Sequence, residues 1–296
     1  MLYASDFSEH GDAVHRDIWI LVLCGKWCDS DCAVCGLQKQ LCTYGGVCEI
    51  EDIKKGSKKM NIALIVAGGT GNRMGQDIPK QFINVYDKPV IIYTLEAFQK
   101  HPNIDEIYVV CLEGWQDILR AYSKQFGITK LKDIFNNGSS AQESIRNGVM
   151  GIKTAKNDDI IIIHDGVRPL VDDSVLSDVI AKCYEFGNAV SSMPYNEQIF
   201  VKTDEKTTNK YIPRDTLRRV STPQAYKYNK LVWAYKKAFD ENIGVGSSSY
   251  TNTMMVDLGE TLHFASGSDR NIKLTTKDNL EIFKAYLKME KDRWLK

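Results

Sequence analysis

The chain has 296 residues, 43% hydrophobic and 26% charged, which is enough for one large domain and a short additional segment. Basic and acidic residues both number 38, and this zero formal net charge argues against a protein that binds nucleic acid through a general basic field. The longest apolar stretch near the start, residues 18–24, is too short for a membrane helix and lacks the flanks of a signal peptide, so we expect a cytoplasmic protein without a membrane partner.

The first 59 residues are rich in cysteine and are expected to form a leader. Cys28, Cys32 and Cys35 have a CxxxCxxC spacing, which can hold an iron–sulfur cluster, or zinc together with a further cysteine. Disulfides are a third possibility. We favour a disordered or non-native leader, because the charged segment 51–59 is typical of a solvated linker and a complete domain, residues 60–296, follows it.

From residue 60 onward, apolar runs of strand length alternate with amphipathic segments of helix length. Strands are predicted at residues 62–66, 107–112 and 160–163, and helices at 115–126 and 174–186. This alternation is typical of an α/β domain with a mainly parallel sheet, in which ligands bind beyond the carboxyl ends of the strands.

Two polar stretches and two cysteines stand apart from this pattern. Residues 195–222 are predicted to form a projecting hairpin arm, and the Gly/Ser-rich residues 244–250 a flexible loop. Cys111 and Cys183 lie in apolar segments and are expected to be small core residues.

A glycine-rich turn follows the first predicted strand: residues 67–75 read AGGTGNRMG, and residues 79–82 read PKQF. Glycines let backbone N–H groups approach phosphate oxygens, and Arg73 and Lys80 add positive charge. The pattern is neither a Walker motif nor a complete GxGxxG fingerprint. A turn that serves geometry alone is the alternative, but the arginine and the PKQF segment at fixed distances favour a triphosphate site.

Together with three later motifs, this turn resembles the cytidylyltransferases that act on methylerythritol phosphate and ribitol phosphate. The later motifs follow in the family's order: HDGVRP at 164–169, STPQ at 221–224 and NIKLTT at 271–276. The resemblance covers the chain from Met60 to its end. It implies a Rossmann-like nucleotidyltransferase domain with a projecting β-arm, and a homodimer that is joined through the arm.

Nucleotidyl transfer requires neutralisation of the reacting phosphate, in-line placement of the nucleophile and a metal that bridges phosphate oxygens. Asp165 follows an apolar strand, so its carboxylate is expected to point into the site and hold Mg²⁺ or another divalent cation. A helix-capping or turn aspartate is the alternative. The predicted catalytic cations, placed around the α-phosphate and the leaving pyrophosphate, are Arg73, Lys80 and Lys273.

The residues expected to bind CTP come from three segments. In the stretch 137–145, Gly138 would let the backbone approach the pyrimidine, and Ser144 would contact the base or cap a helix. Relatives usually carry an acidic residue and an arginine where this chain has Ser139 and Ala141. The predicted CTP contacts are Ala67, Gly68, Gly69, Gly71, Gly138, Ser144 and Thr222.

The resemblance implies that the acceptor is bound from both the sheet and the arm. Arg214 stands where an arm arginine of the family meets the acceptor phosphate in the neighbouring subunit, and Gln198 and Ser249 stand where the family reads polyol hydroxyls. The predicted acceptor contacts are Asp165, Arg168, Gln198, Arg214 and Ser249.

The leading hypothesis is direct attack of a small polyol phosphate on the α-phosphorus of CTP, which gives a CDP-polyol and pyrophosphate. D-ribitol 5-phosphate is the first candidate acceptor, 2-C-methyl-D-erythritol 4-phosphate of isoprenoid synthesis the second, and another polyol phosphate of a surface polymer the third. Two alternatives stay open. One is a sugar-1-phosphate nucleotidyltransferase that uses UTP or dTTP, and the other is a catalytically silent nucleotide-binding regulator.

Overall fold

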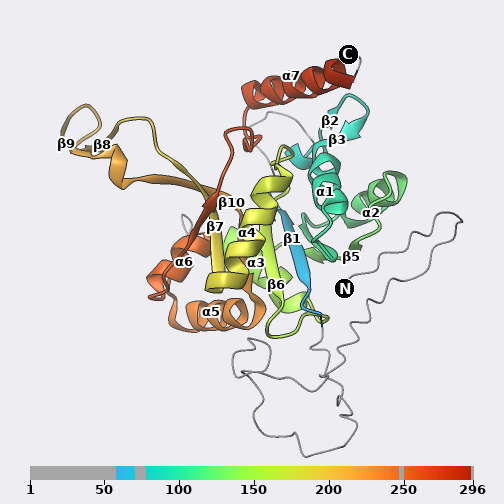
Figure 1. Ribbon diagram of the computed structural model, residues 1–296, viewed down its shortest axis with the longest axis horizontal. Coiled ribbons are helices and arrows are strands. Elements are labelled where there is room, and N and C mark those ends of the chain that lie inside the picture. The colour runs from blue at the N-terminus through green and yellow to red at the C-terminus, as the bar shows by residue number, and fades with distance from the viewer. Residues whose placement is uncertain (1–57, 71–77, 247–249, 295–296) are drawn as a thin grey trace, which may run out of the picture. The chain divides into compact units, whose positions relative to one another are not determined.

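The protein, described by a computed structural model over residues 58–70, 78–246 and 250–294, is built on a seven-stranded sheet (Figure 1). The strand order is β11-β7-β10-β6-β1-β4-β5. Its strands are β1 Asn61–Ala67, β4 Glu106–Cys111, β5 Leu131–Asn136, β6 Ile160–Asp165, β7 Asn188–Pro194, β10 Arg218–Lys227 and β11 Phe264–Ser266.

Parallel pairing dominates this sheet. Strands β6, β1, β4 and β5 are successive parallel neighbours, and β11 is parallel to β7. Only β10, among the described strands, runs antiparallel to both of its neighbours, β6 and β7. The predicted α/β class with a mainly parallel sheet is confirmed. The predicted leader, residues 1–59, lies outside the described residues except for its last two, so its boundary stays a prediction.

Helices cover both faces of the sheet, because successive side chains of a strand point to opposite faces. In β1, Ala63 and Ile65 enter one core, whereas Ile62 and Leu64 enter the other. The first core is covered by α1 Val90–Lys100, α2 Gln116–Gln125 and α4 Asp173–Phe186. The second is covered by α3 Ala141–Gly151, α5 Tyr228–Glu241 and α6 Thr251–Asp257.

Several elements have bounds close to those predicted from the sequence. The predicted helices 115–126 and 174–186 are observed as α2 and α4, each within one residue at either end. Cys111 and Cys183 are free thiols and fully buried, as predicted. The described residues of the predicted loop, 244–246 and 250, lie in neither helix nor strand. No helix in the described part of the chain has the length and apolar character that a bilayer crossing requires.

A third, smaller core lies at the carboxyl edge of the sheet. It joins the segment after η2 Lys80–Phe82, the short hairpin β2 Asn84–Val85 and β3 Lys88–Pro89, and the C-terminal helix α7 Lys277–Trp294. Ile83 and Val85 come from the hairpin segment, Leu274 from the NIKLTT motif and Phe283 from α7. This cluster therefore holds the segments of two predicted catalytic lysines against each other.

The predicted arm is present and projects away from the sheet (Figure 1). It consists of β8 Ile199–Lys202 paired antiparallel with β9 Thr208–Ile212, followed by η3 Arg214–Thr216. Its second limit differs from the prediction, because β10 begins at Arg218 and residues 218–221 pair with β7 in the main sheet. The β7–β10 register shifts between Ser221 and Gln224, where Pro223 has no N–H group to donate.

Candidate active site

Three strands bring the predicted site residues together at the carboxyl edge of the sheet. Neighbouring parallel strands β1 and β6 end beside each other, with Val66 paired to Asp165, so the glycine-rich turn and the HDGVRP motif emerge side by side. The antiparallel strand β10 passes the end of β6, because Gln224 pairs with Ile163. Thr222 therefore lies next to Asp165, and the Asp165 N–H donates to Thr222 Oγ1 at 3.2 Å.

The Asp165 carboxylate lies between two cations. Lys273 Nζ donates to Oδ1 at 3.1 Å, and Arg168 Nε donates to Oδ2 at 2.8 Å. Arg168 is only three residues away on the turn after β6, whereas Lys273 comes from the irregular segment that precedes α7. The Asp165 side chain is 21% exposed, so these ion pairs are partly shielded from water.

The two cations decide the charge state of this carboxylate. Burial raises the pKa of Asp165, but the charges of Lys273 and Arg168, with the Arg168 hydrogen bond, outweigh burial and lower the pKa from 3.8 to about 2. The group is therefore ionised at neutral pH. An ionised carboxylate has about four lone-pair positions, and Lys273, Arg168 and, at 3.5 Å, the Thr222 hydroxyl donate to it, so its oxygens can still take a divalent cation.

The described residues include no group of three or more His, Cys, Asp or Glu side chains that could hold a metal ion. The single ionised carboxylate of Asp165 is a donor that fits Mg²⁺, which is usually bound by one or two carboxylates with water and substrate phosphates.

His164, next to the carboxylate, is a structural residue. Burial lowers the pKa of its imidazole to about 4, so the ring is neutral at physiological pH. Its Nε2 donates to the Arg168 carbonyl oxygen at 3.1 Å, and its ring packs against Phe98 with centroids 5.1 Å apart. This bond holds the turn that carries Arg168. The sequence named the HDGVRP motif but assigned no role to the histidine.

The glycine-rich turn is held by a buried glutamine that sequence reasoning missed. Gln81 Nε2 donates to the carbonyl oxygens of Ala67 at 2.7 Å and Gly69 at 3.0 Å. A Cβ atom on Gly68 would lie 2.6 Å from Asn137 Cβ, so this turn packs directly on the segment predicted to read the base. The PKQF motif was the available signal for Gln81. Predicted residues Gly71 and Arg73 lie outside the described residues.

The predicted base-binding segment is organised by the first turn of α3. Ser144 Oγ accepts from the Gly138 N–H at 2.9 Å and donates to the Ser140 carbonyl oxygen at 2.7 Å. The helix cap is Ser140, whose Oγ accepts from the Glu143 N–H, and Ser144 lies inside the helix. A Cβ atom on Gly138 would lie 2.5 Å from the Glu143 side chain, so a glycine is required here for packing.

The predicted acceptor contacts fall into two sets in the subunit. Asp165 and Arg168 lie at the end of β6, whereas Gln198 and Arg214 lie on the arm and line a pocket of about 420 Å³. Arg214 Nη1 donates to the Asn196 carbonyl oxygen at 3.4 Å, a long bond within the arm itself. Ser249 lies outside the described residues. Among the described residues of the chain, the structure does not bring these two sets into one pocket.

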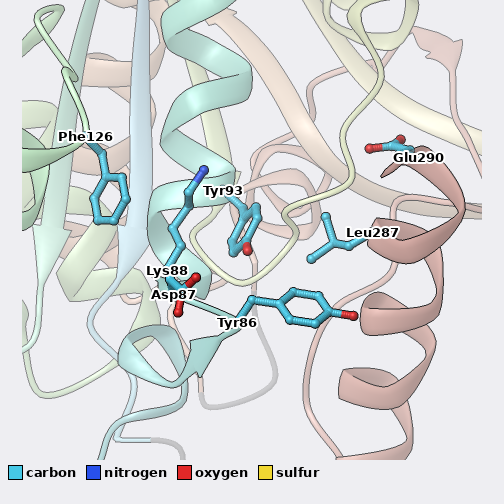
Figure 2. Close-up of a pocket in the computed structure, with 7 residues that line it drawn as sticks. All are labelled: Tyr86, Asp87, Lys88, Tyr93, Phe126, Leu287 and Glu290. Atoms are coloured by element: carbon cyan, nitrogen blue, oxygen red, sulfur yellow. The ribbon is translucent and has the colours of Figure 1, made fainter. Parts of the chain in front are cut away.

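A further pocket, of about 380 Å³, lies between the β2–β3 turn, α1 and α7 (Figure 2). Lys88 points between Phe126 and Tyr93; its Nζ lies 4.6 Å from the Tyr93 ring centroid and 2.6 Å from Glu96 Oε1. The lining contains none of the predicted site residues. Its lysine is already neutralised, so we assign this pocket no part in the chemistry.

A glycine-rich turn after the first strand of a mainly parallel sheet, beside an ionised carboxylate held by two cations, defines a nucleotidyltransferase site. The family model of 2-C-methyl-D-erythritol 4-phosphate cytidylyltransferase (IspD) matches residues 61–289. The chain belongs to this family of cytidylyltransferases, as its motifs predicted.

Individual relatives agree with this assignment. Over 230 residues the chain is 61% identical to the ribitol-5-phosphate cytidylyltransferase of Lacticaseibacillus paracasei, an alignment that covers 77% of this chain and 98% of the relative. It is 34% identical to the 2-C-methyl-D-erythritol 4-phosphate cytidylyltransferase of Clostridium acetobutylicum, with coverage of 77% and 98%.

The solved structures support the fold. The 4-diphosphocytidyl-2C-methyl-D-erythritol synthase of Anaerococcus prevotii superposes with a TM-score of 0.67 at 20% identity and covers 78% of this chain and 99% of its own.

Proposed function

We propose that this cytidylyltransferase joins the cytidylyl group of CTP to D-ribitol 5-phosphate, giving CDP-ribitol and pyrophosphate, in the cytoplasm where CTP is made. The observation that carries the proposal is the 61% identity, over 98% of its length, to a relative that is named for this acceptor. Relatives named for methylerythritol phosphate match at 34–35% or less. Methylerythritol phosphate is therefore the second candidate acceptor.

In the proposed reaction, an oxygen of the acceptor phosphate attacks the α-phosphorus of CTP. A new P–O bond forms there as the bond to the β-phosphate oxygen breaks, and pyrophosphate leaves with that electron pair. No covalent enzyme intermediate is required. Negative charge builds on the non-bridging and leaving oxygens, and Arg73, Lys80 and Lys273 are the side chains that would stabilise it.

The structure supports this role for Lys273 through its geometry. Its ammonium is held at the carboxyl edge of the sheet by Asp165, and its side chain is 34% exposed, so it can reach a ligand. Arg168, on the opposite carboxylate oxygen, keeps Asp165 oriented. Preorganised charges of this kind need no rearrangement when the transition state forms.

Magnesium is part of the proposal. Asp165 is the side chain that would hold Mg²⁺, since it is ionised and keeps free lone pairs. When bound, the ion would neutralise part of the negative charge on the nucleotide phosphates. The chain's own contribution is a carboxylate that Lys273 and Arg168 keep deprotonated and fixed in direction.

We also propose that the active form is a homodimer joined through the arm. The hairpin exposes apolar side chains, with Phe200 55% and Tyr211 69% exposed, and such a surface is costly to leave in water. Arg214 lies on this arm, away from its own subunit's Asp165, and a two-fold exchange of arms would bring it to the partner's site.

Pyrophosphate release tests the proposal directly. The full chain is assayed with CTP or UTP, with and without Mg²⁺, against D-ribitol 5-phosphate, 2-C-methyl-D-erythritol 4-phosphate and glycerol 3-phosphate. The expected result is Mg²⁺-dependent release with CTP and ribitol phosphate, at a kcat/KM at least about a hundredfold above the other acceptors. A preference for methylerythritol phosphate would replace the acceptor but keep the chemistry. No release with any acceptor would favour a silent nucleotide-binding protein.

A further inference from the structure

The segment that carries Lys273 has no regular secondary structure. Between the end of β11 at Ser266 and the start of α7 at Lys277, the chain is neither helix nor strand. No ladder of backbone hydrogen bonds therefore sets the position of Lys273. The Leu274 N–H donates to the Val167 carbonyl oxygen at 2.9 Å, which links the residue after the lysine to the turn that follows β6.

One buried side chain connects this segment to β10. Asn271, two residues before Lys273, is 4% exposed, and its Nδ2 donates to the Thr222 carbonyl oxygen at 2.6 Å. Thr222 is the residue whose hydroxyl accepts from the Asp165 N–H. The amide of Asn271 thus links the lysine segment to the strand that borders the carboxylate.

The backbone of the same residue makes a second link. The Asn271 carbonyl oxygen accepts from Arg168 Nη1 at 2.8 Å, while Arg168 Nε holds Asp165 Oδ2. Asn271 is therefore hydrogen-bonded both to Thr222 and to Arg168, and each of these residues is itself hydrogen-bonded to Asp165. Its Oδ1 is buried and has no hydrogen-bond partner in the described part of the chain, so the amide's link to its surroundings is the Thr222 bond.

We propose that Asn271 is a positioning residue, which fixes the distance between Lys273 and the reacting phosphates by tying the lysine segment to Thr222 and Arg168. The inference rests on the catalytic role of Lys273 in the proposed function. Asn271 does not touch the reacting atoms. It acts through the ammonium, because a displacement of about 1 Å in a charge-stabilising group can lower a rate by up to roughly a hundredfold.

A purely structural role is the competing explanation, and the chain offers a matched control. Asn188 is also 4% exposed, and its Nδ2 donates to the Thr261 carbonyl oxygen at 2.9 Å, linking β7 to the segment before β11. It therefore makes the same kind of bond, from a buried amide to a loop carbonyl, without contact to Asp165, Arg168 or Thr222 in the hydrogen bonds described.

The test compares Asn271→Ala, Asn188→Ala, Lys273→Ala and the double variant Asn271→Ala/Lys273→Ala in the full chain. Thermal unfolding and steady-state kinetics with CTP and ribitol phosphate are measured for each. Asn188→Ala should lose at least as much thermal stability as Asn271→Ala, because the Asn188 Oδ1 also accepts from the His263 N–H at 3.0 Å. Asn271→Ala alone should lower kcat by about ten- to a hundredfold, and in the Lys273→Ala background its further effect should be less than about threefold.

Equal kcat values for Asn271→Ala and the wild type, with Lys273→Ala inactive, would overturn the inference and leave the proposed function intact. Losses that multiply fully in the double variant would also overturn it. Wild-type kcat in Lys273→Ala would instead refute the lysine's catalytic role. If Asn271→Ala does not fold, Asn271→Ser, which keeps a polar group but cannot reach Thr222, replaces it in the same comparison.

Discussion

The Lys273 ammonium lies 3.1 Å from Oδ1 of Asp165, although 108 residues separate the two in the chain. The contact has two consequences. It lowers the pKa of the carboxyl, which makes Asp165 an anion under all physiological conditions. It also holds a long, flexible lysine side chain at the edge where nucleotide phosphates are expected, so that less rotamer entropy is lost on binding.

Lys273→Ala is expected to lower kcat by more than about a hundredfold, because it removes charge stabilisation that acts mainly in the transition state. Lys80→Ala should cause a loss of similar size. Lys230→Ala is the control: Lys230 forms an ion pair with Glu260, and neither belongs to the predicted site. Steady-state rates within a few-fold of wild type for both site variants would contradict the assignment.

Asp165→Asn is expected to weaken magnesium dependence and to change the acid stability of the protein. The folded pKa of about 2 lies below the ordinary 3.8, so the carboxylate stabilises the fold above pH 4, and this contribution disappears as the pH falls through 2. It amounts to roughly 2 kcal/mol. The Tm difference between wild type and Asp165→Asn should therefore be largest at pH 5 and shrink towards pH 2. A difference that is constant with pH, or an unchanged magnesium titration, would count against these roles.

Gly68→Ala should weaken CTP binding and lower stability, because its new Cβ would lie 2.6 Å from Asn137 Cβ and push the glycine-rich turn away from the base-binding segment. Gly69→Ala is the matched variant for stability, since a Cβ at that position meets nothing within 4 Å. Thermal unfolding should distinguish the two, with a lower Tm for Gly68→Ala only, and its KM for CTP should rise. Equal Tm values would show that the turn can move aside.

Mixing two inactive variants should restore activity if the arm completes the neighbouring site. Arg214→Ala and Lys80→Ala, refolded together, would form heterodimers in which one site keeps both residues. With random pairing, about a quarter of all sites would be intact, so up to about a quarter of wild-type turnover should return. Confirmed heterodimers that stay inactive would place Arg214 outside the partner's site. Arg214→Lys should lose acceptor affinity more than CTP affinity, because it lacks the planar fork that binds phosphate.

Removal of residues 1–59 should leave folding and transfer activity intact. The first strand begins at Asn61, and the Met60 N–H already donates to Asp159 Oδ1 at 2.8 Å. In the shortened chain this nitrogen becomes an ammonium beside the same carboxylate, which strengthens the contact. Tm and kcat are compared with those of the full chain. An insoluble or inactive product would show that the leader contributes to the domain.

The sequence predicted those helices and strands that have a regular hydrophobic pattern, and those site residues that carry a charge. The apolar run of β6 and the amphipathic period of α4 are visible in the sequence, and so is Asp165 at the end of its strand. The Asp165–Lys273 contact is not, because it depends on where an irregular segment crosses the sheet. Gln81 and Asn271 were missed for a related reason: buried amides carry neither charge nor periodicity, and their partners are backbone oxygens.

The start of β10 is a second feature that the sequence did not predict. Residues 218–221 are as polar as the arm that precedes them, and only pairing with β7 makes them part of the main sheet. The boundary between the arm and β10 is set by tertiary contacts, and a polar segment gives no sign of these contacts in its sequence.

The projecting arm bears on how such enzymes diversify. Gln198 and Arg214 lie on a hairpin that leaves the sheet, whereas Asp165 and Lys273 meet at the carboxyl edge of the sheet. On the proposed roles, a gene duplicate can acquire a new acceptor through substitutions in the arm, while selection preserves the nucleotide chemistry in the sheet. Two lineages that make different CDP-alcohols can then diverge from one ancestor without passing through an inactive intermediate.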